Sequence, residues 1–230
     1  MPTPYAYFQG NIVPLSEAKI GVMTHAFNYG TAVFEGIRGN WNDDDQTTYL
    51  FRLREHFERL GQSSKILTLQ MHQAVDQLCE IAVELVERSG FTEDVYLRPM
   101  VYLSSEQLGV RLHNLESDTL IFLTPFPAYL PEVARCHTST WRRVQDTGIP
   151  PRAKVTGIYV NSALAKSEAN ANGFDEAIML NENGHVSEGS GENIFMVRDG
   201  RLITPTPADN VLEGITARSV MELAANELGV

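Results

Sequence analysis

The sequence predicts a two-domain α/β protein of the α+β kind, and three observations support this prediction. A chain of 230 residues favours two small domains over one. Segments with helical and with strand periodicity are mixed in both halves of the chain. A proline-rich stretch, Phe126–Glu132, separates two β-rich halves and is typical of a linker. We therefore expect a small N-terminal domain at 1–127, an interdomain linker at 128–134 and a C-terminal domain at 135–230.

The elements of the first half follow from periodicity and turn signals. Tyr5–Phe8 and Ile12–Val13 flank a Gln-Gly-Asn turn, which predicts a hairpin. Thr24 is placed to cap a short helix over residues 25–36. Apolar residues recur at helical spacing between Met71 and Arg88. The other elements expected here are strands at Thr47–Phe51, Val95–Leu103 and Thr119–Pro125 and a helix from about Arg54.

The second half reads as short strands between helices. An Asp-Gly pair at Arg198–Arg201 predicts a hairpin turn. A helix over Gly214–Leu228 would place Val220, Leu223, Ala224 and Leu228 on one side. The other expected elements are strands at Thr138–Val144, Ala177–Leu180 and Asn193–Val197 and an alanine-rich helix at Tyr159–Asn172.

Composition excludes several classes of protein. The net charge of −11 and the lack of a basic run argue against nucleic-acid binding. Cys79 and Cys136 form no C-x-x-C pair, and the six histidines show no metal-ligand spacing, so no metal site is expected. No apolar run reaches the length of a membrane span, and the N-terminus lacks the features of a signal peptide. We expect a cytoplasmic protein without a membrane partner.

Lys154 differs from the other three lysines of the chain. Lys19, Lys65 and Lys166 stand in polar stretches typical of a solvated face, whereas Lys154 lies among small and apolar residues. Such surroundings favour the neutral amine, which a Schiff-base lysine needs. Lys154 is therefore a candidate Schiff-base former, and the alternative is a partly buried structural lysine.

Two carboxylates, Glu188 and Glu192, occupy a glycine-rich bend that leads into an apolar strand pattern. A carboxylate is the partner that a protonated pyridine nitrogen needs in a site for pyridoxal 5′-phosphate (PLP). The Gly189–Gly191 run lacks the spacing of a nucleophile elbow or of a dinucleotide-binding loop.

Other groups suit an anionic cofactor and a carboxylate substrate. Arg59 could bind phosphate, although a surface arginine paired with Glu55 is the alternative. The helix start at Gly214–Thr216 could bind phosphate through its N–H groups or be plainly capped. Tyr96 and Arg98 alternate on a strand and face one side. The pair suits a carboxylate, and the alternative is a solvent face.

In these motifs the chain resembles the branched-chain amino acid aminotransferases among the fold-type IV PLP enzymes. The resemblance covers nearly all of the chain. It is carried by His25–Arg38, Arg54–Leu60, Tyr96–Pro99, Ala153–Lys154 with Tyr159, Ser187–Asn193 and Leu212–Thr216. It implies the two-domain fold-type IV architecture, with the region at 135–230 as an incomplete cofactor-binding domain. Because the sequence stops just after Gly229, we expect a C-terminal part of the family's fold to be missing.

The resemblance also implies a role for each matching residue. Lys154 would form the internal aldimine with PLP, Glu188 would pair with the pyridine nitrogen, and Tyr159 would hydrogen-bond the phenolic oxygen. The residues implied at the phosphate are Arg59, Leu212, Ile215 and Thr216. The residues implied on the substrate side are Phe34, Tyr29, Arg38, Tyr96 and Arg98, with Arg98 taking the distal carboxylate of glutamate.

The implied reaction is ping-pong transamination between branched-chain L-amino acids (leucine, isoleucine, valine) and 2-oxoglutarate, with glutamate and branched-chain 2-oxo acids as the other partners. A homodimer or a higher homo-oligomer is expected. Two alternatives stay open. One is another fold-type IV activity, namely D-amino acid or (R)-amine transamination or aminodeoxychorismate lyase, and the other is an inactive truncated fragment.

Overall fold

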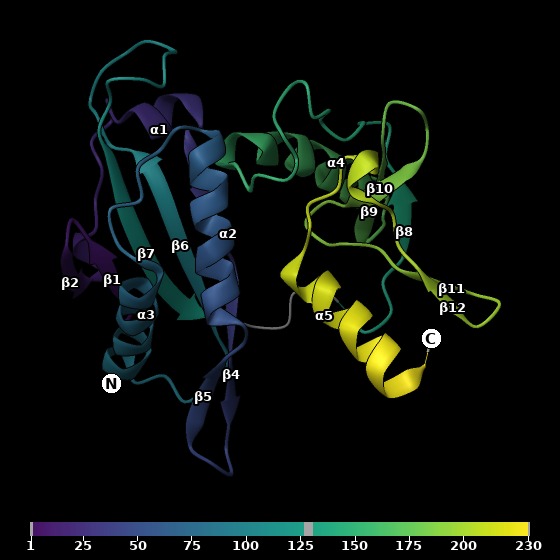
Figure 1. The fold of residues 1–230 in the computed structure, drawn as a ribbon, viewed down its shortest axis with the longest axis horizontal. Coiled ribbons are helices and arrows are strands. Elements are labelled where there is room, and N and C mark those ends of the chain that lie inside the picture. Colours follow the sequence, from purple (N-terminus) through teal and green to yellow (C-terminus); the bar gives the residue numbers. More distant parts are fainter. Residues whose placement is uncertain (1, 127–130, 230) are drawn as a thin grey trace. The chain divides into compact units, whose positions relative to one another are not determined.

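The structure is a computed structural model of the chain and describes residues 2–126 and 131–229. It consists of two compact units (Figure 1). The first contains Met1–Tyr129 with Lys154–Gly157, and the second contains Leu130–Ala153 with Ile158–Val230. Lys154 therefore belongs structurally with the N-terminal unit, although the sequence placed it in the C-terminal domain. Residues 128–130 of the expected linker lie outside the described residues.

The first unit is built on a seven-stranded antiparallel sheet in the order β2-β1-β7-β6-β4-β5, with β3 also paired to β6. The strands are β1 Tyr5–Phe8, β2 Asn11–Pro14, β3 Ala32–Phe34, β4 Ile37–Asn42, β5 Thr47–Leu50, β6 Val95–Leu103 and β7 Ser117–Pro125. The helices are α1 His25–Tyr29, α2 Leu53–Ile66 and α3 Val75–Ser89. The predicted N-terminal hairpin and the strand at Val95–Leu103 are confirmed.

Helices α2 and α3 pack together and against the sheet, as Figure 1 shows. Phe57 and Leu60 of α2 are completely buried, as are Leu78, Ala82 and Leu85 of α3. The i, i+3, i+4 and i+7 spacing places these side chains on one face of each helix. Helix α3 ends at Gly90, which has the left-handed φ of 62° that glycine adopts at low cost.

The helix expected over residues 25–36 is confirmed only at His25–Tyr29, and the prediction is wrong for the residues after it. Helix α1 ends at Gly30, which adopts a left-handed φ of 66°. The chain then extends into β3, which pairs with β6 from Ala32 opposite Tyr102 to Phe34 opposite Met100. The pairing surface of β6 thus outweighs local helical preference. Thr24 stands at the expected N-cap position, but its side chain makes no capping hydrogen bond.

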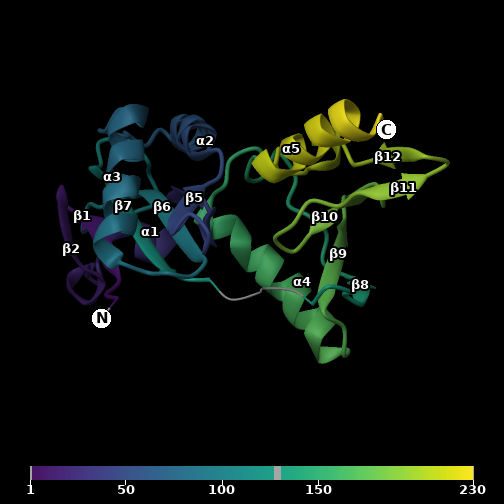
Figure 2. The same cartoon turned by 90° about the horizontal axis from the view of Figure 1, so that it is seen from below.

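The second unit contains a three-stranded sheet in the order β10-β9-β8, a two-stranded hairpin and two main helices. Figure 2 shows α4 alongside β9 and β8, which run parallel. Ala165 and Ala169 of α4 pack with Ala177 and Met179 of β9 in a small core. The elements are β8 Cys136–Thr138, α4 Tyr159–Ala171, β9 Glu176–Leu180, β10 Val186–Gly189, β11 Met196–Arg198, β12 Arg201–Ile203, α5 Ile215–Leu223 and a π-helical turn Ala224–Leu228.

Two expected strands of this unit are shifted. The strand predicted at Thr138–Val144 is observed only at Cys136–Thr138. Glu168 of α4 accepts hydrogen bonds from the backbone amide of Thr140, at 2.9 Å, and from its hydroxyl, at 2.6 Å. These bonds satisfy Thr140 outside the ladder, while the backbone N–H groups of Ser139 and Arg143 still donate to the Ile178 and Leu180 carbonyls of β9. The strand predicted at Asn193–Val197 begins only at Met196, and the Arg198–Arg201 turn is confirmed.

The C-terminal helix buries fewer of its apolar side chains than expected. Of its predicted side Val220, Leu223, Ala224 and Leu228, only Ala224 is buried, and Leu223 is 60% exposed. Among the described residues, no helix combines the length and apolarity that crossing a bilayer requires.

Candidate functional site

Lys154 lies in a short extended segment held against β3. The backbone N–H of Phe34 donates to the Lys154 carbonyl at 3.0 Å, and Val155 forms an antiparallel bridge with Val33. The Lys154 N–H donates to Ser63 Oγ of α2 at 3.3 Å. The flanking Ala153 and Val155 are buried, which agrees with the apolar setting that the sequence indicated. The backbone of Lys154 is therefore fixed from two sides.

Phe34 brings Lys154 and Arg98 to one aromatic ring. Lys154 Nζ is 5.0 Å from the centroid of the Phe34 ring, and Arg98 Cζ is 4.4 Å from it. Arg98 Nη2 donates to the hydroxyl of Tyr96 at 2.9 Å, so the prediction that Tyr96 and Arg98 share one face of β6 is confirmed. An added Cβ on Gly36 would overlap that hydroxyl, so a larger residue here would require the Tyr96 side chain to move.

Arg59 does not pair with Glu55, the alternative that its helical spacing suggested. Its Nε and Nη2 each donate at 2.7 Å to the two carboxylate oxygens of Glu35, and His56 Nδ1 lies 2.7 Å from the same carboxylate. Glu35 is completely buried. Burial raises the pKa of this carboxyl group, but the hydrogen bonds and charges of His56 and Arg59 outweigh burial and hold it below its ordinary value.

Arg38 and Tyr29 have different surroundings from the other predicted substrate residues. Arg38 lies opposite Tyr96 in the β4–β6 ladder, but its guanidinium is half-exposed and pairs with Asp94 at 3.3 Å. Tyr29 lies on α1, where its hydroxyl accepts a hydrogen bond from the Gly109 amide at 3.0 Å. Their roles at a substrate stay predictions.

The second unit holds Glu188 in a buried network at the end of β10. Arg143 Nη2 lies 2.7 Å from Glu188 Oε1, and both side chains are more than nine-tenths buried. Glu188 Oε2 accepts from the backbone N–H of Leu212 at 3.0 Å and from Asn193 Nδ2 at 3.3 Å. The bend that the sequence singled out therefore presents an ion-paired carboxylate.

Helix α5 starts beside this network. Its N-cap residue is Gly214, which has no side chain to accept hydrogen bonds from the first turn, where Ile215 and Thr216 lie. An added Cβ on Gly214 would overlap Asn193 Oδ1. A helix N-terminus without a side-chain cap suits an anion, because its N–H groups and dipole favour negative charge. Tyr159, the remaining predicted residue of this unit, begins α4.

Lys166 is not in the solvated setting that the sequence suggested. Its side chain is three-quarters buried, pairs with Glu176 and donates to the Asp175 carbonyl at 2.7 Å. This pairing favours the charged ammonium, whereas a Schiff-base lysine must reach the neutral form.

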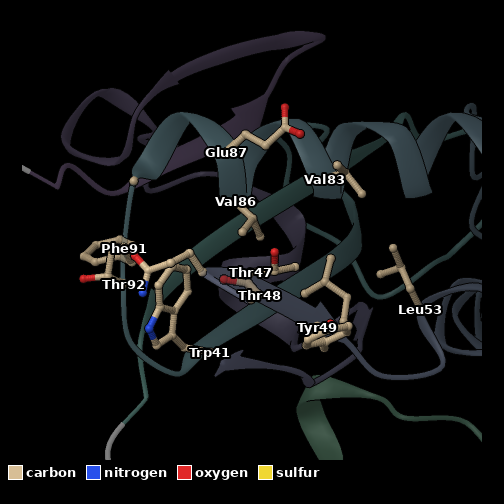
Figure 3. Close-up of a pocket in the computed structure, with 13 residues that line it drawn as sticks. Trp41, Thr47, Thr48, Tyr49, Leu53, Val83, Val86, Glu87, Phe91 and Thr92 are labelled. Atoms are coloured by element: carbon tan, nitrogen blue, oxygen red, sulfur yellow. The ribbon is translucent and has the colours of Figure 1, made fainter. Parts of the chain in front are cut away.

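A cavity of about 670 Å³ elsewhere in the first unit contains none of the predicted site residues. Figure 3 shows Trp41 and Tyr49 of the β4–β5 hairpin facing Val83 and Val86 of α3. The described residues contain no group of three or more histidine, cysteine or acidic side chains that could hold a metal ion.

Comparison with known proteins places this arrangement in a family. Residues 32–230 match the model for amino-transferase class IV. A probable branched-chain-amino-acid aminotransferase of Aquifex aeolicus is 46% identical over 98% of this chain and 73% of its own. The chain belongs to the class IV aminotransferases.

Solved structures agree with this assignment. The branched-chain aminotransferase from Thermoproteus uzoniensis with norvaline has a TM-score of 0.95 and 45% identity, covering 99% of this chain and 76% of that one. A T.th. branched-chain amino acid aminotransferase complexed with N-(5′-phosphopyridoxyl)-L-glutamate has a TM-score of 0.90 and 40% identity, covering 97% and 74%. This chain therefore spans about three quarters of the length of these relatives. The shared architecture confirms the predicted fold class.

The residues of this class IV aminotransferase fit PLP, the cofactor of the family. A lysine flanked by buried apolar residues suits the aldehyde, and the helix start at Gly214 without a side-chain cap suits the phosphate. The ion-paired Glu188 suits a protonated ring nitrogen. The protein is a PLP-dependent aminotransferase.

Sequence reasoning missed two partners of the predicted residues. Glu35 holds Arg59, and Arg143 holds Glu188. Glu35 stands within the family motif His25–Arg38, so that motif was an available signal. Arg143 has no such local signal, because its partner is distant in the sequence.

Proposed function

We propose that this aminotransferase transfers the amino group between branched-chain L-amino acids and 2-oxoglutarate by a ping-pong mechanism. The observation that carries the proposal is the placement of Lys154 and Arg98 on the ring of Phe34, with Tyr96 bonded to Arg98. The names of the relatives support the substrate class. The glutamate adduct of the T.th. enzyme supports glutamate and 2-oxoglutarate as the second pair.

Lys154 would hold the cofactor through its amine and then move a proton between the substrate Cα and C4′ of the cofactor. Its backbone bonds to Phe34 and Ser63 limit the positions that the amine can reach. Bound PLP supplies an electron sink for the bonds at Cα.

The remaining cofactor residues would orient the ring and the phosphate. Glu188 would pair with the ring nitrogen, and Tyr159 would donate a hydrogen bond to the phenolic oxygen. The phosphate would be held by Arg59 and by the start of α5, where the residues in question are Leu212, Ile215 and Thr216. The bidentate pair with Glu35 fixes the orientation of the Arg59 guanidinium.

The substrate side must accept both an apolar side chain and the distal carboxylate of glutamate. Arg98 can serve both, because its guanidinium lies over the face of the Phe34 ring and donates a hydrogen bond to the hydroxyl of Tyr96. An apolar side chain would pack on the aromatic rings, whereas a carboxylate would bind the guanidinium. Arg38 and Tyr29 would complete this side.

The first test is the absorption spectrum of the purified protein with PLP. We expect a visible band that L-leucine bleaches and 2-oxoglutarate restores, because the two half-reactions are separate.

Lys154→Ala should abolish turnover, whereas Lys65→Ala, which changes an exposed lysine, should not. Turnover of D-alanine or an (R)-amine without turnover of L-leucine would replace this proposal by the other fold-type IV activities. A protein that takes up no PLP would contradict both.

We also propose that the enzyme acts as a homo-oligomer. Apolar side chains are exposed on two neighbouring segments of the first unit. His25 links the segments, because its backbone N–H donates to the Ser105 carbonyl at 2.9 Å and its Nε2 lies 2.6 Å from the Gly109 carbonyl. The exposed residues are Ile20, Val22, Met23, Phe27, Leu108 and Val110. Apolar surface gathered in this way is typical of a protein interface.

A further inference from the structure

Arg143 is a buried arginine whose main partner is the carboxylate of Glu188. Its Nη2 lies 2.7 Å from Glu188 Oε1, and its side chain is only 6% exposed. A buried carboxylate of this kind needs a counter-charge, because transfer out of water strongly disfavours an unpaired anion. In the described part of the second unit, Arg143 supplies that charge.

The backbone N–H and Nη1 of Arg143 connect the Arg143–Glu188 ion pair to β9 and to α4. The Arg143 N–H donates to the Leu180 carbonyl of β9 at 2.9 Å. Its Nη1 lies at a long 3.5 Å from Ser162 Oγ, three residues after Tyr159 in α4. Arg143 thus connects the carboxylate expected at the ring nitrogen with the helix that carries the tyrosine expected at the phenolic oxygen.

Packing alone does not account for an arginine at this position. Its Nε is buried and has no hydrogen-bond partner among the described residues. A buried donor without a partner costs stability, and an apolar residue of similar volume would often be tolerated as well or better in a purely structural role. The arginine is instead suited to acting on the charge of Glu188.

We propose that Arg143 is a positioning residue for the cofactor ring, which keeps Glu188 ionised and oriented toward the ring nitrogen of PLP. The proposal rests on the role proposed above for Glu188. The carboxylate has one oxygen on Arg143 and the other on Leu212 and Asn193. Loss of Arg143 removes the charged donor on Oε1, so Glu188 would take up a proton more readily and its attraction for a protonated ring would weaken.

The test compares the binding of PLP with that of an analogue whose ring nitrogen is replaced by carbon. Both compounds keep the aldehyde, the phenolic oxygen and the phosphate, so the ratio of their dissociation constants reports the nitrogen contact alone. We expect the wild-type protein to prefer PLP and Arg143→Met to reduce that preference by about tenfold or more, as for the loss of a charge-assisted hydrogen bond. Arg142→Met, which changes the exposed neighbour, should leave the ratio unchanged.

Each outcome separates the role of Arg143 from a structural one. Equal weakening of both compounds by Arg143→Met would overturn the proposal. Should that variant fail to fold, Arg143→Lys keeps the charge but not the planar fork, and we expect a smaller loss of preference. An unchanged ratio in a folded Arg143 variant, while Glu188→Gln abolishes the preference, would also overturn it. A wild-type protein that binds neither compound would contradict the proposed function itself.

Discussion

Arg59 shows how a local pattern and a distant contact compete at the scale of single residues. Its spacing from Glu55 on α2 is that of a helical ion pair, but its guanidinium is bound by Glu35, 24 residues earlier in the chain. Glu55 instead lies 4.0 Å from Arg52. A buried bidentate pair provides two aligned hydrogen bonds where solvent does not compete, so it prevails over the exposed local pair.

Replacement of Glu35 by glutamine tests this pair. At neutral pH we expect Glu35→Gln to lower the free energy of unfolding by about 3 kcal/mol, because Arg59 loses its buried counter-charge. Glu55→Gln, which changes a partly exposed side chain of the same helix, should cost less than about 1 kcal/mol. Urea unfolding of the two variants is the measurement, and equal losses would contradict the assignment.

The pH dependence of the Glu35→Gln effect has a definite sign. The pKa of Glu35 is held below its ordinary value by His56 and Arg59, despite the opposing effect of burial. Its contribution to stability is therefore present above the pKa of the unfolded chain and is lost as the pH falls through the folded pKa. The difference between wild type and Glu35→Gln should accordingly narrow in acid.

The same competition decided which site residues the sequence could predict. Lys154 could be nominated as a candidate because both of its neighbours are small or apolar, a property visible in the sequence and retained in the structure. The sequence did not predict Arg143 as part of this network, because Arg143 pairs with Glu188, which lies near it only in the folded chain. Residue type and local setting can thus nominate a group, whereas its partner is decided by packing.

At the scale of elements, Gly214 links the start of α5 to the Glu188 network. An added Cβ would overlap Asn193 Oδ1, and the amide nitrogen of Asn193 donates to Glu188 and to the Leu212 carbonyl. The close approach of Asn193, and not the backbone conformation, favours glycine here, since the φ of −69° is open to any residue.

Gly214→Ala should therefore weaken PLP binding by about tenfold, because Asn193 must move and Glu188 loses one of its donors. The matched control is Gly191→Ala in the glycine-rich bend that carries Glu188, where an added Cβ meets nothing within 4 Å. Titration of each variant with PLP gives the two affinities. If both variants bound PLP as the wild type does, Gly214 would not be needed for the network.

The long strand of the first unit and the short N-terminal hairpin were predictable, whereas one short strand of the second unit was displaced. The strand Val95–Leu103 is observed with its predicted bounds, because nine alternating residues find a full-length partner in β7. The strand predicted at Thr138–Val144 is displaced, because the side chain of Glu168 captures the Thr140 amide. A single side-chain contact can redirect a segment of a few residues, but not one whose whole ladder is paired.

At the scale of the whole molecule, one group of exposed apolar side chains lies on two neighbouring, hydrogen-bonded segments of the first unit. Val22 is 78% exposed and Val110 is 84% exposed, although both lie in segments that are well fixed by hydrogen bonds. Asn28 donates to the Val22 carbonyl at 3.0 Å, and the Gly109 amide donates to Tyr29. Ordered segments that present large apolar side chains to water are expected to be covered by a partner.

We therefore predict that the protein forms a homo-oligomer through this surface. The double substitution Val22→Asp with Val110→Asp should shift sedimentation toward the monomer, because each aspartate would have to lose its hydration at the interface. The control is Val83→Asp, which changes an exposed valine of α3 outside this surface and should leave the oligomer intact. A wild-type protein that sediments as a monomer, or an oligomer that tolerates both aspartates, would show that this surface is not the interface. Tyr29 borders the same surface through its bond to Gly109, so the double substitution should also raise the KM for branched-chain substrates if oligomer formation places Tyr29 on the substrate side.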